Sequence, residues 1–175
     1  ETGLSEIGMS DYKRILSLDS ALAIVCFTKD AVKYERNYFV SYPDNVMVIK
    51  FSADKSGMQN LVFSYGANPE ADGKIIPDGK KGLLYAGKLK NNGMEFALRI
   101  QARHKGGTLE ATPEGKLVAK NADEVIFLIT ADTDYQMNFN PDFNDSKTYV
   151  GVNPIESTQT IMKATEVYTY NELKE

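Results

Sequence analysis

Apolar and polar positions group into short runs separated by turn residues from Ala21 to Asp132. The run at 21–28 reads ALAIVCFT and meets a Lys-Asp pair, and the run at 46–53 reads VMVIKFSA and meets Asp-Lys-Ser-Gly. Strands of this length and spacing, without helical periodicity between them, predict a mainly β protein built as an antiparallel sandwich or barrel. The stretch between 65 and 82 is rich in Gly, Pro and Asp and is expected to be a loop. The other expected strands span 32–42, 60–65, 82–89, 94–104, 108–111, 116–120 and 124–131.

Alternation within the run at 32–42 separates two faces of the expected strand. One face carries Val32, Tyr34, Arg36, Tyr38, Val40 and Tyr42, and the other carries Lys33, Glu35, Asn37, Phe39 and Ser41. We interpret the tyrosine face as half-buried, because a tyrosine ring can pack while its hydroxyl reaches the rim. An exposed aromatic platform for sugar rings is the alternative. Pro43-Asp44 predicts the turn that follows.

Alternation in the run at 94–104 predicts a sheet with one face toward water. Met94, Phe96, Leu98 and Ile100 point one way, and Glu95, Ala97, Arg99, Gln101 and Arg103 point the other way. The run EVIFLITA at 124–131 is apolar on both faces, so we place it at the centre of the sheet. Asn and Gly at 91–93 suit a tight hairpin, because both tolerate positive φ.

After Asp132 the chain becomes a long polar and aromatic stretch with little periodicity. Loops of this length in a compact domain are usually functional or lie at an interface. A helix is expected next, with Asn153 as its cap and Pro154 in its first turn. Thr169 and Glu172 match a capping box, which predicts the start of a second helix. We therefore expect a sandwich domain at 1–152 and short C-terminal helices at 153–175.

Composition excludes several classes of function. The net charge is -4 and the sequence pI about 5.2, which provides no basic surface for nucleic acid. No apolar stretch reaches the roughly 20 residues of a membrane span. Cys26, the one cysteine, lies in an apolar run and is expected to be a small core residue. The single His104 excludes a site with several histidine ligands.

Catalytic motifs are missing from the chain. There is no GxSxG, HExxH, P-loop, dinucleotide-binding or CxxC pattern, so we predict no catalytic residue, metal or cofactor. Acidic pairs such as Asp132 with Asp134 do not establish the opposed carboxylates of a glycosidase. The stretch at 132–145 lacks the glycine and final Glu of an EF-hand, and an irregular calcium site is a minor alternative.

The stretch from Tyr12 to Gly57, YKRILSLDSALAIVCFTKDAVKYERNYFVSYPDNVMVIKFSADKSG, resembles the N-terminal domain of glycoside hydrolase family 95, the α-L-fucosidase and α-L-galactosidase family. NADEVIFLITADTDY and YNELKE also resemble later segments of that family. The chain departs from the family at Asn37-Tyr38, where an acidic residue is often close by. The positions that match the family pattern are Tyr12, Arg14, Leu16, Leu18, Asp19 and Ala21, then Arg36, Phe39, Ser41, Pro43 and Asp44, then Val46, Val48, Ile49 and Ala53.

The resemblance implies a sandwich of the galactose-mutarotase-like kind, a supersandwich that begins with a longer N-terminal segment. It also implies a following (α/α)6 barrel that holds the catalytic acid and the asparagine-assisted base, neither of which has a counterpart here. Members are commonly exported by gut bacteria that digest glycans, so the resemblance implies a secreted or periplasmic protein. The chain begins without Met, and we expect a processed or shortened form.

Three functions are compatible with these features. The chain can be the accessory sandwich of a fucosidase-like hydrolase and a partner of its catalytic barrel. It can instead be a carbohydrate-binding module that binds glycans by ring stacking, or an enzyme by itself. We favour the first, because no acid-base pair is present. Expected contacts with the barrel, and with the rim of its sugar site, are Tyr135, Asn138, Phe139, Asn140 and Asp142.

Overall fold

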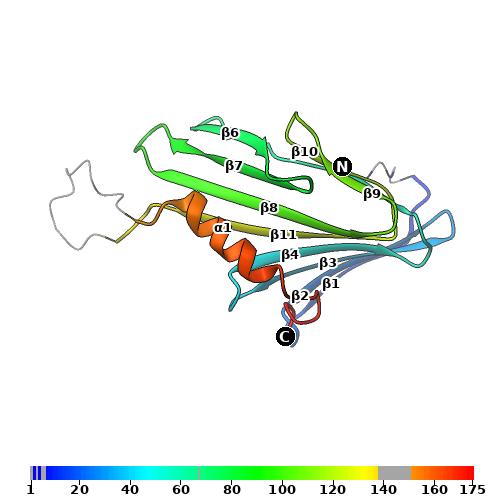
Figure 1. Cartoon of the computed structure of the whole chain (residues 1–175). Coiled ribbons are helices and arrows are strands. Elements are labelled where there is room, and N and C mark those ends of the chain that lie inside the picture. The colour runs from blue at the N-terminus through cyan, green and yellow to red at the C-terminus, as the bar shows by residue number, and fades with distance from the viewer. Residues whose placement is uncertain (1, 3, 5–6, 67, 138–150) are drawn as a thin grey trace.

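Figure 1 shows the computed structural model, which describes residues 2, 4, 7–66, 68–137 and 151–175. Two antiparallel sheets and one helix, α1 (Pro154–Thr165), make up this part of the chain. The larger sheet has the order β1 (Ser10–Ser17), β2 (Leu22–Lys29), β3 (Val32–Ser41), β4 (Val46–Ala53), β11 (Glu124–Thr133), β8 (Glu95–Lys105), β7 (Gly82–Leu89) and β6 (Ala71–Pro77). The smaller sheet has the order β5 (Gln59–Ser64), β10 (Lys116–Ala122) and β9 (Thr108–Ala111). The mainly β sandwich expected from the sequence is confirmed.

Every strand expected from the sequence is present, but β1 and β6 were not expected. β6 occupies the stretch interpreted as a loop, at the edge of the larger sheet, where it pairs with β7. Its glycine and proline are tolerated there: Gly73 admits the Tyr85 ring, which would lie 2.4 Å from an added Cβ, and Pro77 ends the strand. β1 pairs with β2 at the opposite edge, and none of its residues is buried. Edge strands have only one neighbour, so their sequences carry a weak pattern.

The two faces of the larger sheet contact different layers. We call the face toward the smaller sheet the inner face and the face toward α1 the outer face. On the inner face, Val125 and Phe127 of β11 join a core cluster with Leu61 of β5 and Leu117 of β10. Phe127 also lies against Phe63, with ring centroids 4.9 Å apart. This aromatic contact packs the smaller sheet against the larger one.

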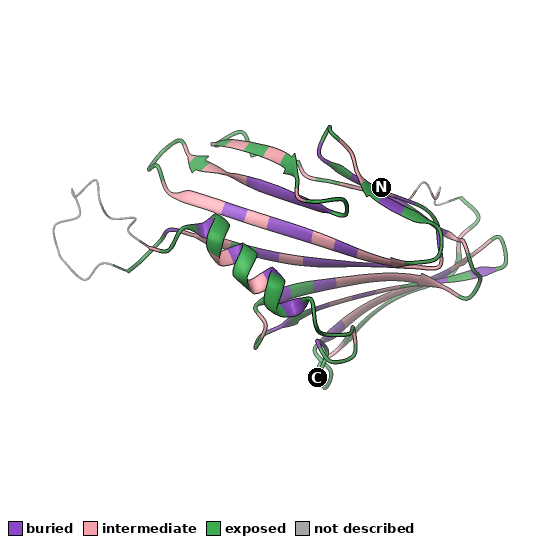
Figure 2. Cartoon of the chain, viewed as in Figure 1, coloured by how far each residue is buried: buried purple, intermediate pink, exposed green. Residues whose placement is uncertain are grey.

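The outer face of β11 is equally buried. Ile126 and Leu128 pack with Val48 of β4, Met162 of α1 and Leu173 near the C-terminus. β11 lies between β4 and β8, so its predicted central position is confirmed. Figure 2 shows buried positions repeated along β8 and β11.

The polar face of β8 does not face water, and that prediction is wrong. Helix α1 covers this face, and Arg99 is only 4% exposed. Its guanidinium pairs with Asp78 and donates to the carbonyl of Ile155 at 3.3 Å. Arg103 donates to the carbonyl of Thr165, at the end of α1, at 2.7 Å. The alternation was correctly detected, but the polar side chains bind helix carbonyls rather than water.

Strand β3 changes its buried face along its length. Val32 and Tyr34 are buried on the inner face, where Tyr34 stacks on Phe27 at 5.1 Å. Further along, Phe39 is buried on the outer face against Tyr170, while Tyr42 on the inner side is 93% exposed. The half-buried tyrosine face is therefore correct only for the first half of the strand. The C-terminal segment causes the change, because it covers the outer face there.

The expected start of α1 is confirmed. Asn153 Oδ1 accepts from the Ile155 N–H at 2.9 Å, and Pro154 lies in the first turn. The capping box also forms: Thr169 N–H donates to Glu172 Oε2 at 2.7 Å, and Glu172 N–H donates back to Thr169 Oγ1 at 3.4 Å. Residues 169–174 make hydrogen-bonded turns rather than a second helix.

Charged substitutions test the double burial of β11. We expect Ile126→Asp and Phe127→Asp each to lower the free energy of unfolding by about 3 kcal/mol or more, since each buries an unpaired carboxylate. Val40→Asp on β3 is the control, because Val40 is 64% exposed and should change stability by only about 0.5 kcal/mol. Urea denaturation measures all three. A β11 variant that unfolds at the midpoint of the parent protein would contradict the prediction.

Candidate functional site

The predicted site lies in the stretch that follows β11. Asp134 and Gly151 flank this stretch, and we call this pair of residues the loop base. The backbone N–H of Asp134 donates to Glu95 O at 3.1 Å, and its Oδ1 accepts from Glu95 N–H at 2.9 Å. Its carbonyl accepts from the Gly151 N–H at 2.8 Å. The chain thus leaves the larger sheet at Asp134 and returns beside the same residue at Gly151. These bonds hold Asp134 and Gly151 at the end of the sheet where β8 begins.

A second contact connects the loop base to α1. The Ser157 hydroxyl in the first turn of the helix donates to Asp132 Oδ2. The other oxygen of this carboxylate accepts from the Thr133 N–H at 2.8 Å. The carboxylates of Asp132 and Asp134 therefore both accept hydrogen bonds from neighbouring backbone or hydroxyl groups. These contacts are structural and do not present either carboxylate as a catalytic acid or base.

Of the predicted contact residues, Tyr135 is described by the structure. It is exposed, directly after the anchored Asp134, and its N–H donates to Thr133 Oγ1 at 3.3 Å. The other four, Asn138, Phe139, Asn140 and Asp142, lie outside the described residues. Their contact with a catalytic domain remains a prediction.

An apolar hollow of about 450 Å³ lies beside the base. Its aromatic walls are Tyr85 of β7 and Phe96 of β8, whose ring centroids are 5.0 Å apart at an interplanar angle of 65°. The Tyr85 hydroxyl accepts from the N–H of Asn68, which also lines the hollow. Such a hollow can hold an apolar surface, such as one face of a sugar ring, but it contains no acid-base pair. Sequence reasoning missed it, because its residues come from separate strands and carry no shared motif.

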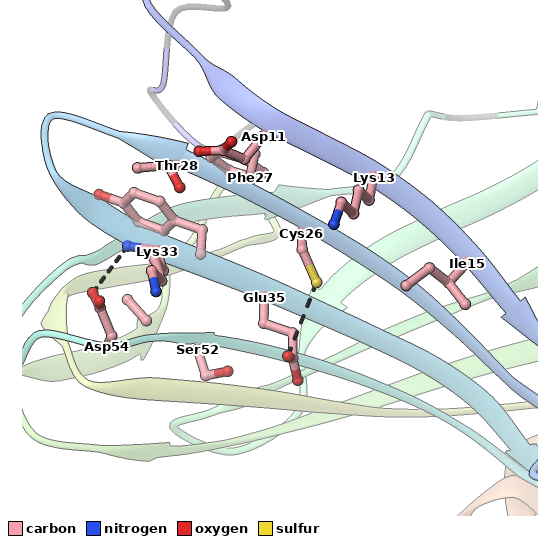
Figure 3. Close-up of a pocket in the computed structure, with 12 residues that line it drawn as sticks. Asp11, Lys13, Ile15, Cys26, Phe27, Thr28, Lys33, Glu35, Ser52 and Asp54 are labelled. Carbon is pink, nitrogen blue, oxygen red and sulfur yellow. Dashed lines mark hydrogen bonds between the residues drawn. The ribbon is translucent and has the colours of Figure 1, made fainter.

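A larger hollow, of about 790 Å³, lies on the outer face of β1–β4 (Figure 3). Lys13, Cys26 and Glu35 lie along its floor on three neighbouring strands. The Cys26 thiol lies 4.0 Å from Glu35, and burial together with this carboxylate raises the pKa of Cys26. A raised pKa disfavours the reactive thiolate form. The residue is half-buried rather than part of the core.

Neither hollow resembles a metal centre. Among the described residues, no group of three or more His, Cys, Asp or Glu side chains is placed to hold a metal ion. In the same part of the chain, no helix has the length and apolar character needed to cross a membrane.

His104 lies near the end of β8, far along the strand from the loop base. Its Nδ1 is buried and has no hydrogen-bond partner within the described part of the chain. Burial, and secondarily the charge of Lys81, lower the pKa of His104 below its ordinary value of 6.5. The environment therefore favours neutral imidazole, as expected for a structural histidine rather than a triad base.

Gly151→Ala tests the closed base. An added Cβ would lie 2.6 Å from the carbonyl oxygen of Asp134, so we expect a loss of about 1–3 kcal/mol in the free energy of unfolding. Gly66→Ala is the matched control, because nothing lies within 4 Å of its Cβ position. Thermal unfolding compares the two variants. Equal stability of both would show that the backbone contact at Gly151 is not closely packed.

The lowered pKa of His104 predicts an acid-dependent loss of stability. Above about pH 6.5 both the folded and the unfolded states hold neutral imidazole, so the contribution is fully present. Below that pH the unfolded state binds the proton first, and the free energy of unfolding falls. Urea denaturation from about pH 7.5 to 5 should show a smaller fall for His104→Gln than for the parent protein. Identical pH profiles would contradict the prediction.

Comparison with known proteins places this geometry in context. The sequence model of the family described as glycosyl hydrolase family 65, N-terminal domain, matches residues 3–138. "Alpha-L-fucosidase 2" of Arabidopsis thaliana is 25% identical over 94% of this chain, and "Probable alpha-fucosidase A" of Aspergillus niger is 29% identical over 93%. The chain spans 21% of the length of each of these relatives.

A solved structure named "Putative kojibiose phosphorylase from human microbiome" shares the fold. It superposes with a TM-score of 0.60 at 13% identity, over 97% of this chain and 24% of the other. The sequence resemblance named family 95, whereas the matching model is described for family 65. Both describe the N-terminal domain of a glycoside hydrolase, and the two relatives named as fucosidases agree with the fucosidase-like character expected.

Proposed function

This chain belongs to the family described as glycosyl hydrolase family 65, N-terminal domain, and we propose that it is the accessory β-sandwich domain of a larger fucosidase-like hydrolase. One observation carries the proposal. The family model covers most of the chain, while the chain spans only about a fifth of the two relatives named as fucosidases. In those relatives most of the polypeptide lies outside the matching region. We propose that a catalytic barrel in this remainder performs the reaction on α-L-fucosides.

The C-terminal segment supports a role as a scaffold for that barrel. Arg99 and Arg103 hold the two ends of α1 against β8, through the carbonyls of Ile155 and Thr165. A helix bonded to the sheet at both ends leaves the sandwich in a defined direction, which suits a rigid connection to a following domain. We propose that residues 153–175 begin this connection and that 1–152 form the sandwich.

The polar and aromatic stretch after β11 is the proposed contact with the barrel. The bond between Asp134 and Gly151 holds the two flanks of this stretch together. Ordering a long polar segment costs conformational entropy, which contact with a partner domain can offset. Tyr135, exposed beside the base, is its best-defined contact residue.

The environment of the protein follows from the family resemblance alone. We propose a secreted or periplasmic protein of a bacterium that digests fucosylated glycans.

Binding of glycans by the sandwich itself is the second candidate function. The hollow between Tyr85 and Phe96, with Asn68 at its edge, favours it, because aromatic walls with a polar rim suit a sugar ring. A titration of the isolated chain with a fucosylated oligosaccharide tests this candidate. Saturable shifts of the Asn68 amide resonance would support it, and unchanged spectra at millimolar sugar would exclude it.

The principal test compares the isolated chain with the longer parent protein. We expect the parent to release nitrophenol from a nitrophenyl α-L-fucoside and the isolated chain to stay at the level of a buffer blank. Hydrogen exchange should also become slower across residues 134–153 when the barrel is present. Turnover by the isolated chain would contradict the accessory role. Equal exchange in both proteins would show that the stretch only closes its own sandwich.

A further inference from the structure

The two layers of the sandwich differ in width. The larger sheet has eight strands, whereas the smaller sheet has three among the described residues. The smaller sheet packs over β4, β11, β8 and β7, where it forms the main core cluster. The inner face of β1, β2 and β3 therefore extends beyond its cover.

Part of this extension is already covered by residues that precede β1. Leu4 and Met9 pack against the cluster of Phe27, Val32 and Tyr34, at the end of β3 where the inner face is buried. Residues outside the smaller sheet thus continue its layer at one end. At the other end of β3 no described residue does so.

The uncovered part of the inner face is apolar and runs from β1 across β2 and β3 to Met47 of β4. The register aligns Leu16 with Ala23 and Tyr38, and aligns Val40 with Met47. Leu16, Val40 and Met47 are exposed, as is Tyr42 just after β3. We call Leu16, Tyr38, Val40, Tyr42 and Met47 the open inner patch.

The open inner patch joins the core of the sandwich directly. Met47 pairs with Ile129 across β4 and β11, and Tyr38 pairs with Ile49. Ile129 and Ile49 pack against the main core cluster. A hollow of about 420 Å³ lies over Leu16, Ala23 and Tyr38. Single exposed apolar residues are ordinary, but a contiguous set that extends a core usually marks an interface.

We propose that the open inner patch is covered by an apolar segment of the same longer polypeptide, packed in the layer of the smaller sheet. This inference rests on the proposal that the chain is part of a larger hydrolase. The 21% span of the two relatives leaves ample polypeptide to supply the segment. Continuity with the core favours a cover from the same polypeptide, because one layer of one sandwich then buries the whole face. A soluble sugar would leave most of these aliphatic side chains without an apolar partner.

Matched lysine substitutions test the proposal. Val40→Lys places a charge in the patch, and Ile76→Lys places one on β6, outside the patch, at a residue that is 49% exposed. In the isolated chain we expect both variants to melt within about 2 °C of the parent sequence. In the longer protein Val40→Lys should lower Tm by about 5 °C or more, while Ile76→Lys leaves it unchanged. A neutral Val40→Lys in the longer protein would overturn the proposal.

A second measurement keeps the test decisive if the lysine variant fails to fold. Hydroxyl-radical labelling of Tyr42 and Leu16 in the unmodified proteins should fall at least about five-fold from the isolated chain to the longer protein, as their side chains lose contact with solvent. Equal labelling would overturn the proposal, as would a gene that encodes nothing beyond this chain. A dimer of the isolated chain that Val40→Lys dissociates in sedimentation experiments would identify a second copy as the occupant instead.

Activity on the nitrophenyl fucoside separates this inference from the proposed function. If the longer protein cleaves the substrate but tolerates Val40→Lys, the proposed function stands and the proposal that a segment covers the open inner patch is excluded. If the longer protein lacks that activity, but Tyr42 is protected and Val40→Lys is destabilising, the covered patch stands and the proposed function is excluded.

Discussion

The central constraint on this fold is that β11 must be buried on both faces. Its residues alternate between two apolar layers, with Val125 and Phe127 toward the smaller sheet and Ile126 and Leu128 toward α1. Burying a large aliphatic or aromatic side chain contributes about 1.5–3 kcal/mol, so both layers are needed to stabilise this one strand. The smaller sheet and the C-terminal helix, far apart in sequence, are thus both required by the same strand.

The outer layer depends on two arginines as much as on apolar contacts. Arg99 would be costly to bury alone, but its Nη1 pairs with Asp78 and its Nη2 donates to the carbonyl of Ile155. Arg103 binds the Thr165 carbonyl where the dipole of α1 favours a cation. Because both arginines come from β8, the helix is aligned with the strand that also anchors Asp134 through Glu95. One strand therefore sets the position of both the exit helix and the loop base.

This arrangement suits the accessory role proposed for the domain. The structure fixes two features by hydrogen bonds. One is helix α1, which Arg99 and Arg103 hold against β8, and the other is the loop base at Asp134 and Gly151. The carboxylates Asp132 and Asp134 are used to build these connections. The family described as an N-terminal domain, and the small share of its relatives that the chain spans, agree with such an accessory role.

The sequence by itself determined the features that depend on neighbouring residues in the chain. Short apolar runs between turn residues located each interior strand of the larger sheet. The turn residues at 43–44 and 91–93 located two hairpins, and Asn153 located the start of α1. Capping and turn formation are local, so their residues can be identified without the rest of the fold.

The tertiary structure decided which strand faces are exposed to solvent and which distant residues are in contact. The polar side of β8 was detected, yet only the position of α1 shows that Arg99 is buried. β6 became a strand because β7 pairs with it, and β3 changed its buried face because Tyr170 covers Phe39. The contact of Gly151 with Asp134, and the hollow at Tyr85 and Phe96, likewise join residues that share no pattern. Burial is a property of what lies opposite a side chain, and a distant segment of the chain supplies it.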